Sequence, residues 1–522
     1  MVTTEEKNLA TTEINSLEND SGEVLEAVLS VNGREFQLNE KNVDQAMKMA
    51  LAAEDIELTP ERANKLKWKI DLYLIPFFIM VYAVQYMDKI TNSFAAVMGI
   101  KTDMNMSGTE YSWLGSAFYL GYLVFEVPAS MLLQRFPVAK VTSIFIFCWG
   151  AVVLLCPATN TPGLLFLRVV LGMMESSITP AMVILTGQWY RKEEHFLRTA
   201  IWLGSCSVGS VIGYLISYGL YVHGGDWSIA SWKVVYLVIG CWNIVISILF
   251  YFHIPDTPSG AWFLTEEEKL MAVKRIKENN QGYGNKTFKK EQFMECLKDY
   301  RIWLIFVFGV VNEIPNGGIT NFSSILFNSD FGFSVKRSLL LSAQKSTCGF
   351  VIIVAFGSLY SLGLIKSRIF VSLLATCVSL TGASMLAFSD SKKARLGGLF
   401  IMTTSDLGII CMLSIFQSNV AGHTKKVVGN AIFLIAYCAG NVIGPQTFKA
   451  NEAPNYPTAK GAIVGCYAAS IFLMLVMFAS YYFENKMRDK KRDALGDAYV
   501  KQENIEFADL TDKQNPEFRY SL

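Results

Sequence analysis

Long hydrophobic runs, separated by short polar stretches, dominate this chain. Each run is close to the roughly 20 residues that a helix needs to cross the hydrocarbon core of a bilayer. The runs lack the regular polar face that a helix carries in a soluble protein. They cover residues 70–100, 111–133, 141–158, 164–190, 199–222, 232–254, 302–327, 338–364, 369–388, 396–420, 427–448 and 462–483. The pattern therefore predicts an all-α integral membrane protein with twelve transmembrane helices.

The runs form two sets of six, and a charged interval separates the sets. Pro255 and Pro258 open the interval and should end the sixth helix, because proline breaks helices. Thr265 followed by Glu268 has the spacing of a capping box, which predicts the start of a short helix. We predict five parts: an N-terminal tail (1–69, with an amphipathic stretch at 43–53), a six-helix half (70–254), a linker (255–301), a second six-helix half (302–483) and a C-terminal tail (484–522).

Charge orients the chain and excludes some functions. Only 17% of the residues are charged, against about a quarter in an ordinary soluble domain. The net charge of +1 comes without a basic stripe, so we expect no binding to nucleic acid. Lys and Arg flank the spans in both tails and in the linker, which predicts that all three face the cytoplasm. Lys392, Lys393 and Arg395 would lie on the other side and are exceptions to this rule.

Catalytic and metal-binding patterns are missing from the sequence. The 10 Cys residues lie mostly in hydrophobic runs without a CxxC pair, and 4 His residues are too few for a histidine-built metal site. There is no GxSxG, HExxH or phosphate-binding loop. We therefore expect neither an enzyme nor a bound cofactor.

The fifth run carries three glycines at close spacing, Gly204, Gly209 and Gly213, which predict close packing against another membrane helix.

Two pairs of charges in the first half are functional candidates. A charge at bilayer depth costs about 2.5–3.5 kcal/mol, so each should have a partner or a function. Lys89 would hold a substrate carboxylate and its neighbour Asp88 would exchange a proton; alternatively, the pair anchors the helix at the membrane interface. Arg168 and Glu175 lie about two turns apart on one helix face. They form either a functional pair or a structural salt bridge. Glu126 is a further charge, in the second run.

The second half has three intramembrane charges, namely Glu313, Lys345 and Asp406. Either Lys345 is neutralised by one or both acids in a structural set, or the three line a cavity and favour a substrate that carries both charges. Pro315 with the two glycines at 317 and 318 should break the seventh helix and free backbone groups for a ligand. Other polar or aromatic residues in the runs are candidates for substrate binding: Tyr86, Asn312, Asn316, Gln344 and Asn441.

Several segments, in order along essentially the whole chain, carry a family resemblance. They are QYMDK, RVVLGMMESSITP, IPDTPSGAWFLTEEEK, IPNGGIT, AGHTKK, AGNVIGPQTF and EFADLTDKQNPEFRYSL. Together they resemble the anion:cation symporter family of the major facilitator superfamily, and within it the fungal allantoate permease group. The resemblance implies the major facilitator fold. It also implies that Asp88 and Glu175 bind protons, that Lys89 contacts the substrate anion and that Arg168 tunes Glu175. Many members have Arg in place of Lys89, so the bidentate fork is missing here.

The resemblance implies a proton-coupled symporter that imports a small organic anion, such as allantoate or ureidosuccinate, by alternating access. Its partners would be the substrate, protons and the lipid bilayer, and its transport unit would be a monomer. The expected location is the plasma membrane, with the vacuole or another endomembrane as the alternative. A permease for a zwitterionic amino acid, a dipeptide, nicotinate or pantothenate is an alternative function. A second alternative is a transporter-like nutrient sensor that does not transport.

Overall fold

The computed structural model describes residues 24–29, 35–39, 59–226, 228–277, 289–361, 367–495 and 510–522. The amphipathic stretch predicted at 43–53 lies outside these residues. In the N-terminal tail, β1 (Val24–Leu29) pairs with β2 (Glu35–Asn39) as an antiparallel hairpin. All other regular structure in the described part of the chain is helical.

Among the described residues, twelve helices are long and apolar enough to cross a membrane, which confirms the predicted number. These spans comprise α3 (Pro60–Lys89), α6 (Gly108–Arg135), α7 (Val138–Leu155) with η1 (Cys156–Ala158), α8 (Thr161–Glu175) with α9 (Ile178–Trp189), α10 (Lys192–Val222), α11 (Ser231–His253), α14 (Tyr300–Ile325) with the π-helical turn η4 (Leu326–Asp330), α15 (Val335–Ser361), α16 (Arg368–Phe388), α17 (Lys392–Ile401) with η5 (Met402–Thr404) and α18 (Ser405–Asn419), α19 (His423–Gln446) and α20 (Pro457–Leu495). The shorter helices are α4 (Thr91–Val97), α5 (Ile100–Asp103), η2 (Gly224–Asp226), η3 (Pro258–Gly260), α12 (Glu266–Lys277), α13 (Lys290–Lys298) and η6 (Ala450–Glu452).

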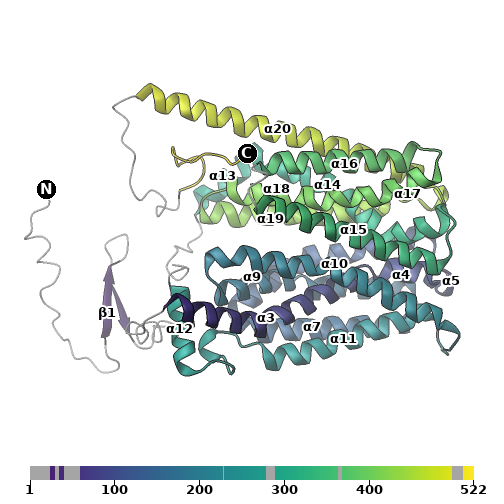
Figure 1. Ribbon diagram of the computed structural model, residues 1–522, viewed down its shortest axis with the longest axis horizontal. Helices are drawn as coiled ribbons and strands as arrows, with labels where there is room; N and C mark the ends of the chain where they lie inside the picture. Colours follow the sequence, from purple (N-terminus) through teal and green to yellow (C-terminus); the bar gives the residue numbers. More distant parts are fainter. Residues whose placement is uncertain are drawn as a thin grey trace, which may run out of the picture.

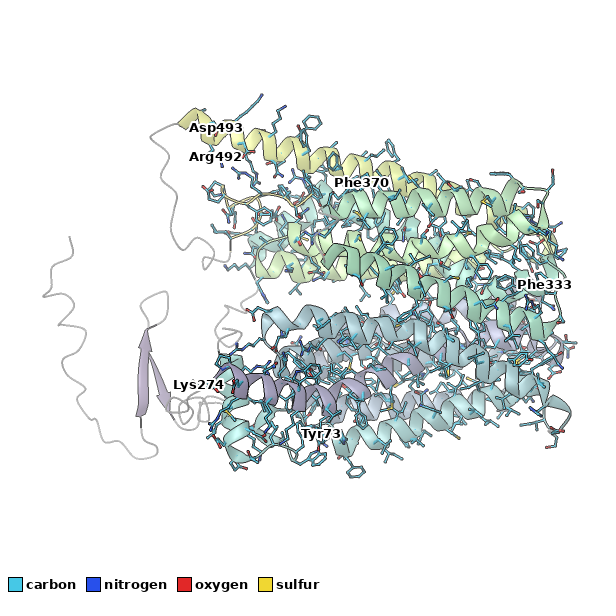
Figure 2. The ribbon with its side chains drawn as sticks, viewed as in Figure 1. Tyr73, Lys274, Phe333, Phe370, Arg492 and Asp493 are labelled. Atoms are coloured by element: carbon cyan, nitrogen blue, oxygen red, sulfur yellow. The ribbon has the colours of Figure 1, made fainter. Side chains whose placement is uncertain are left out.

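The spans form two bundles that lie side by side in Figure 1, α3 to α11 in purple to teal and α14 to α20 in green to yellow. The bundles meet where α10 packs on α15, α6 on α19 and α4 on α14. We call the end that carries α12, α13 and the C-terminus the linker face, and the opposite end the far face (Figure 1). Figure 2 shows Lys274 and Arg492 at the linker face and Phe333 at the far face.

Glycines allow some of these helices to approach closely. A Cβ at Gly209 of α10 would lie 2.0 Å from the carbonyl oxygen of Ala83 on α3, and one at Gly213 would lie 2.7 Å from Met87. Gly204 has no such neighbour within 4 Å. The predicted glycine packing is therefore confirmed at two of the three positions.

The predicted break in the seventh helix is wrong, because α14 continues through Pro315 to Ile325. The glycines that follow Pro315 serve packing instead. A Cβ at Gly317 would lie 2.7 Å from the Asn441 backbone on α19, and one at Gly318 would lie 2.7 Å from the Phe448 ring. A neighbouring helix thus takes the place that a bound ligand was expected to fill.

Helix α12 of the linker belongs to the first bundle. Its predicted capping box is confirmed, since the Thr265 amide donates to Glu268 at 2.9 Å and the Glu268 amide donates to the Thr265 hydroxyl at 3.3 Å. Lys69 of α3 donates to Glu268 at 2.6 Å, and Arg62 pairs with Glu267 at 3.1 Å. These contacts tie α12 to the start of the first span.

Helix α13 and the last described segment belong to the second bundle. The buried Lys425 ammonium of α19 donates to Glu295 of α13, to Asp299 between α13 and α14, and to Asp512, at 2.8, 2.9 and 2.6 Å. Burial alone would raise the pKa of Asp299, but the hydrogen bond and charge of Lys425 outweigh it and hold this pKa below its ordinary value. Tyr520 completes the cluster, because its hydroxyl donates to Asp512 and accepts from Arg301 of α14, both at 2.7 Å. Residues 510–522 are thus built into the linker face.

Arg395 is one of the three basic residues that do not follow the concentration of Lys and Arg on the cytoplasmic side, and it has a structural partner. At the far face, Arg395 donates to both oxygens of Asp330 at 2.5 Å, and Lys460 donates to the same carboxylate at 2.7 Å. The Asp330 side chain is fully buried. Arg395 therefore neutralises a buried acid.

We predict that Gly209→Ala prevents correct folding, whereas Gly204→Ala on the same helix is tolerated. The first Cβ would overlap a backbone atom that cannot move without shifting α3, and overpacking of this kind typically costs about 1–3 kcal/mol or more. Gel filtration of detergent-solubilised protein should show a loss of the monodisperse peak for Gly209→Ala alone. Equal behaviour of the two variants would contradict the predicted packing.

Candidate functional site

The functional candidates of the first bundle gather near the end of α3. Asp88 is fully buried, and the indole N–H of Trp149 on α7 donates to one of its oxygens at 3.0 Å. Its other oxygen has no hydrogen-bond partner in the described part of the chain. Arg168 is the cation whose charge acts on Asp88. The carboxylate is thus only half satisfied by hydrogen bonds, which leaves an oxygen able to hold a proton.

Lys89 lies in a box of aromatic rings that spans the two bundles. Its ammonium is 5.6 Å from the ring centre of Phe118, 5.2 Å from that of Tyr119 and 5.6 Å from that of Tyr437. It donates to the Tyr437 hydroxyl of α19 at 3.1 Å. Rings attract a cation through their electron-rich faces and leave its remaining N–H groups available to an anion.

Arg168 and Glu175 are both buried on α8 but form no ion pair within the described structure. Seven residues rise by about 10 Å along a helix, which separates the two side chains although they share a face. Arg168 instead donates to Tyr236 at 2.7 Å, and Tyr236 donates to Asn92 at 3.0 Å. The side chain of Gln85 on α3 interacts with Glu175, and Lys89 is the cation that acts on it most strongly.

An amide cluster holds the main acid of the second bundle. Asn316 of α14 and Asn441 of α19 donate to the same oxygen of Glu313, at 2.7 and 2.9 Å. Asn312 is buried one turn away, and its side-chain oxygen has no partner in the described chain. The structure thus brings Glu313, Asn316 and Asn441 together, and the charge of Lys89 acts on this cluster through Glu313.

Lys345 and Asp406 are near each other without contact. The charges of Lys345 and Asp406 attract each other, but neither side chain forms an ion pair within the described residues. Asp406 also acts on Tyr86 of the first bundle. Glu313 is hydrogen-bonded to its amides and also feels the charge of Asp406, but none of the three charged groups forms an ion pair with another within the described residues.

Gln344 differs from the buried candidates in its exposure. Its side chain is exposed on the face of α15 that also carries the exposed Val351 and Val354, opposite the buried Ser338 and Ser342. Its function in substrate binding stays a prediction. A single residue step on a helix turns the side chain by about 100°, so Gln344 and Lys345 point in different directions.

Sequence reasoning missed the aromatic partners of the site. Trp149, Tyr236 and Phe118 lie in runs rich in aromatics, where no pattern distinguishes them. Tyr437 had a signal, because it precedes Asn441 by four residues and therefore shares its helix face. A search for polar atoms on that face would have found it.

The bundles are joined at the far face. Among the described residues, every hydrogen bond between the bundles lies at the level of Lys89 or farther from the linker face. Besides that of Lys89, these bonds join Ser93 to Ser324 at 2.9 Å, Tyr111 to the Asn321 carbonyl at 2.8 Å, Ser116 to the Val442 carbonyl at 2.7 Å, and Gln446 to Ser116 at 2.9 Å. The cavity left beside Lys89 and Arg168 measures about 10 Å³, room for about one water molecule. The site is closed from the far face.

Two helical bundles that meet at a buried polar centre, closed at one face, define a membrane transporter with a central site. Residues 78–445 match the model of the Major Facilitator Superfamily, and the chain belongs to this family. It is 42% identical to the allantoate permease of Saccharomyces cerevisiae over 99% of this chain and 98% of that protein. It is 43% identical to an uncharacterised transporter of Schizosaccharomyces pombe, over 93% and 94%. A thiamine pathway transporter of S. cerevisiae is 31% identical, over 92% of both chains.

Solved structures support the fold. A bacterial homologue of the human lysosomal transporter Spinster, inward-facing and occupied, matches with a TM-score of 0.58 at 14% identity, over 79% of this chain and 96% of that one. The inward-open, partially occluded xylose transporter of Escherichia coli matches with a TM-score of 0.57 at 12% identity, over 77% and 97%. The family and these relatives are membrane transporters and not enzymes, so this chain is a multi-pass transporter of the same superfamily.

Proposed function

We propose that this protein is a proton-coupled symporter that imports a small organic anion of the allantoate or ureidosuccinate class by alternating access. The observation that carries the proposal is the Lys89 ammonium in its aromatic box, within reach of both bundles. The similarity to an allantoate permease over nearly the whole chain supports the substrate class.

A substrate carboxylate would bind the free N–H groups of Lys89. The ammonium is a point charge, so it accepts a carboxylate from several directions rather than through one fixed fork. Tyr437 links this contact to the second bundle, where the side-chain oxygens of Asn316 and Asn441 would each accept one further hydrogen bond from the polar remainder of the solute. Ureido and amide groups of an allantoate-like anion are suited to such partners.

Proton coupling would use Asp88 and Glu175. Both are fully buried and neither forms an ion pair among the described residues; one oxygen of Asp88 has no hydrogen-bond partner there, and Glu175 interacts with the neutral side chain of Gln85. A carboxylate without compensation at bilayer depth costs about 2.5–3.5 kcal/mol, so protonation favours reorientation of the carrier. The carrier would therefore reorient when empty or when loaded with both proton and anion. Arg168 would act chiefly on Asp88.

The alternative substrate is a zwitterion, such as an amino acid or dipeptide. The observation in its favour is that Lys345 and Asp406 stay near each other without an ion pair. A solute that carries both charges would satisfy both groups at once, which a simple anion would not. We assign these two residues, with Glu313, to substrate selection.

We further propose a plasma-membrane location with the linker face in the cytoplasm. The basic residues near the span ends support this orientation, because Lys and Arg concentrate on the cytoplasmic side. The far face would then be extracellular, and the described state would face inward.

Uptake of radiolabelled allantoate, ureidosuccinate, nicotinate, pantothenate, amino acids and dipeptides in a permease-deficient fungal cell tests the proposal. We expect uptake of allantoate or ureidosuccinate that is faster at acidic external pH and is abolished by a protonophore. Preference for an amino acid or dipeptide would favour the zwitterion permease. Uptake without any response to pH or protonophore would rule out proton coupling, and no uptake at all would favour a sensor.

Glu175→Gln should abolish accumulation of the anion but leave exchange of labelled for unlabelled anion largely intact. The amide cannot release a proton, yet it remains neutral in both orientations, so the loaded carrier still moves. Reconstituted protein allows both activities to be measured on one sample. Glu193→Gln, an exposed carboxylate on α10, is the control and should behave like the unaltered protein. Equal loss of accumulation and exchange would assign Glu175 a structural function.

Lys89→Ala should weaken binding of carboxylate substrates by about ten- to hundredfold, as expected for loss of a charged hydrogen bond. Competition between labelled allantoate and unlabelled anions measures the affinity. Lys336→Ala, which removes an exposed ammonium on α15, provides the comparison and should leave affinity unchanged. An unchanged affinity in Lys89→Ala would remove this residue from the binding site.

A further inference from the structure

The mechanism above leaves one membrane carboxylate without a function. Glu126 lies on α6, on the helix face that meets the second bundle. A spacing of four, three and four residues places on this face Gly115, Tyr119, Tyr122 and Glu126. Val124 and Val127, on the other side of α6, are 72% and 65% exposed. Glu126 therefore points between the bundles and away from the exposed side of the helix.

Glu126 has no charged partner in the described chain. One of its oxygens is buried without a hydrogen bond. The titratable groups on which its charge acts are Tyr122 of α6 and Cys438 of α19. Four charged groups of the neighbouring helices are engaged elsewhere: Lys140 of α7 with Tyr251, Arg168 of α8 with Tyr236, Glu175 of α8 near Lys89, and Glu313 of α14 with its amides. On α19, the Tyr437 hydroxyl accepts from Lys89, and Lys426 is exposed near the start of the helix. A carboxylate kept unpaired at this depth calls for a function.

Hydroxyl groups lie between Glu126 and Glu175, namely those of Thr179, Tyr82 and Tyr122. Tyr82 of α3 donates to the Thr179 hydroxyl of α9 at 2.9 Å, and the Tyr122 hydroxyl also interacts with Thr179. Thr179 follows Glu175 by four residues and Tyr122 precedes Glu126 by four, so each is about one turn from its carboxylate. Because these helices run toward the linker face at these positions, the hydroxyl groups lead from Glu175 toward that face.

We propose that Glu126 is the proton-release residue on the linker side: it takes the proton from Glu175 through the hydroxyls of Thr179 and Tyr122 and passes it to water at the linker face. The inference rests on the proton coupling proposed above. Each hydroxyl accepts one proton and gives up its own, so neither oxygen keeps a charge. One proton thus moves from carboxylic acid to carboxylate and then to water. The bundles form no hydrogen bond on the linker side of Lys89 within the described residues, which leaves this route open in the present state.

Purified protein in liposomes tests this function, with labelled allantoate as the probe and an internal pH-sensitive dye to follow protons. We expect Glu126→Gln to slow uptake driven by an inward proton gradient, and the accompanying proton entry, by at least about tenfold, since positioned proton carriers contribute 10²–10⁴-fold. Allantoate counterflow at equal pH should be retained. Tyr122→Phe should slow gradient-driven uptake in the same way, and Glu126→Asp should keep most of it.

Glu291→Gln, an exposed carboxylate on α13, is the matched control and should behave like the unaltered protein. Unchanged gradient-driven uptake in Glu126→Gln would overturn the inference and leave the symporter proposal standing. Equal loss of uptake and counterflow in both Glu126→Gln and Glu126→Asp would overturn it as well, because it would indicate a structural residue. If the unaltered protein transports allantoate without moving protons, the proposed coupling and this inference fail together.

Discussion

The free-energy cost of placing a charged side chain inside a bilayer is the constraint on which the rest of this structure depends. Charges near the two faces are paired: Asp330 holds two cations at the far face, and Lys425 holds three carboxylates at the linker face. Mid-membrane charges are treated differently. Lys89 has rings and one hydroxyl, and Glu313 has amides. Neutral partners stabilise a charge without fixing it, so these groups can exchange a partner for a ligand or a proton.

Much of the fold follows from the sequence, because hydrophobic length and charge placement are local properties. They gave twelve spans, the division into two sets of six and the capping box at Thr265. The side-chain contacts of the site are harder to predict from the sequence, because they depend on how the helices pack. Spacing placed Arg168 and Glu175 on one face but could not show that Arg168 donates to Tyr236 of α11. The failure at Pro315 has the same cause, since α19 decides whether the glycines beside it unwind or pack.

The two bundles contribute unequally to the central site. The first supplies the cation and two fully buried carboxylates, and the second supplies amides, one amide-bound acid and the Tyr437 hydroxyl. The Lys89 to Tyr437 hydrogen bond crosses between the bundles at the site itself, so its geometry depends on how the bundles are placed relative to each other. A ligand that holds both groups would therefore link binding to the relative position of the bundles, through contact rather than over distance.

The attachment of residues 510–522 has a consequence for biosynthesis. Lys425 and Arg301 are buried against carboxylates and hydroxyls that include Asp512 and Tyr520. Chains emerge from the ribosome in order, and domains generally fold as units from the N-terminus. The ion pairs of the first bundle at the linker face, including those of α12, have both partners once residue 277 has been made. The second bundle stays incomplete, with buried cations lacking some of their partners, until residues 512 and 520 have been made. A nascent chain, or one terminated before these residues, would thus present unpaired charge at the linker face, a feature by which cellular quality control can distinguish it from a chain that contains them.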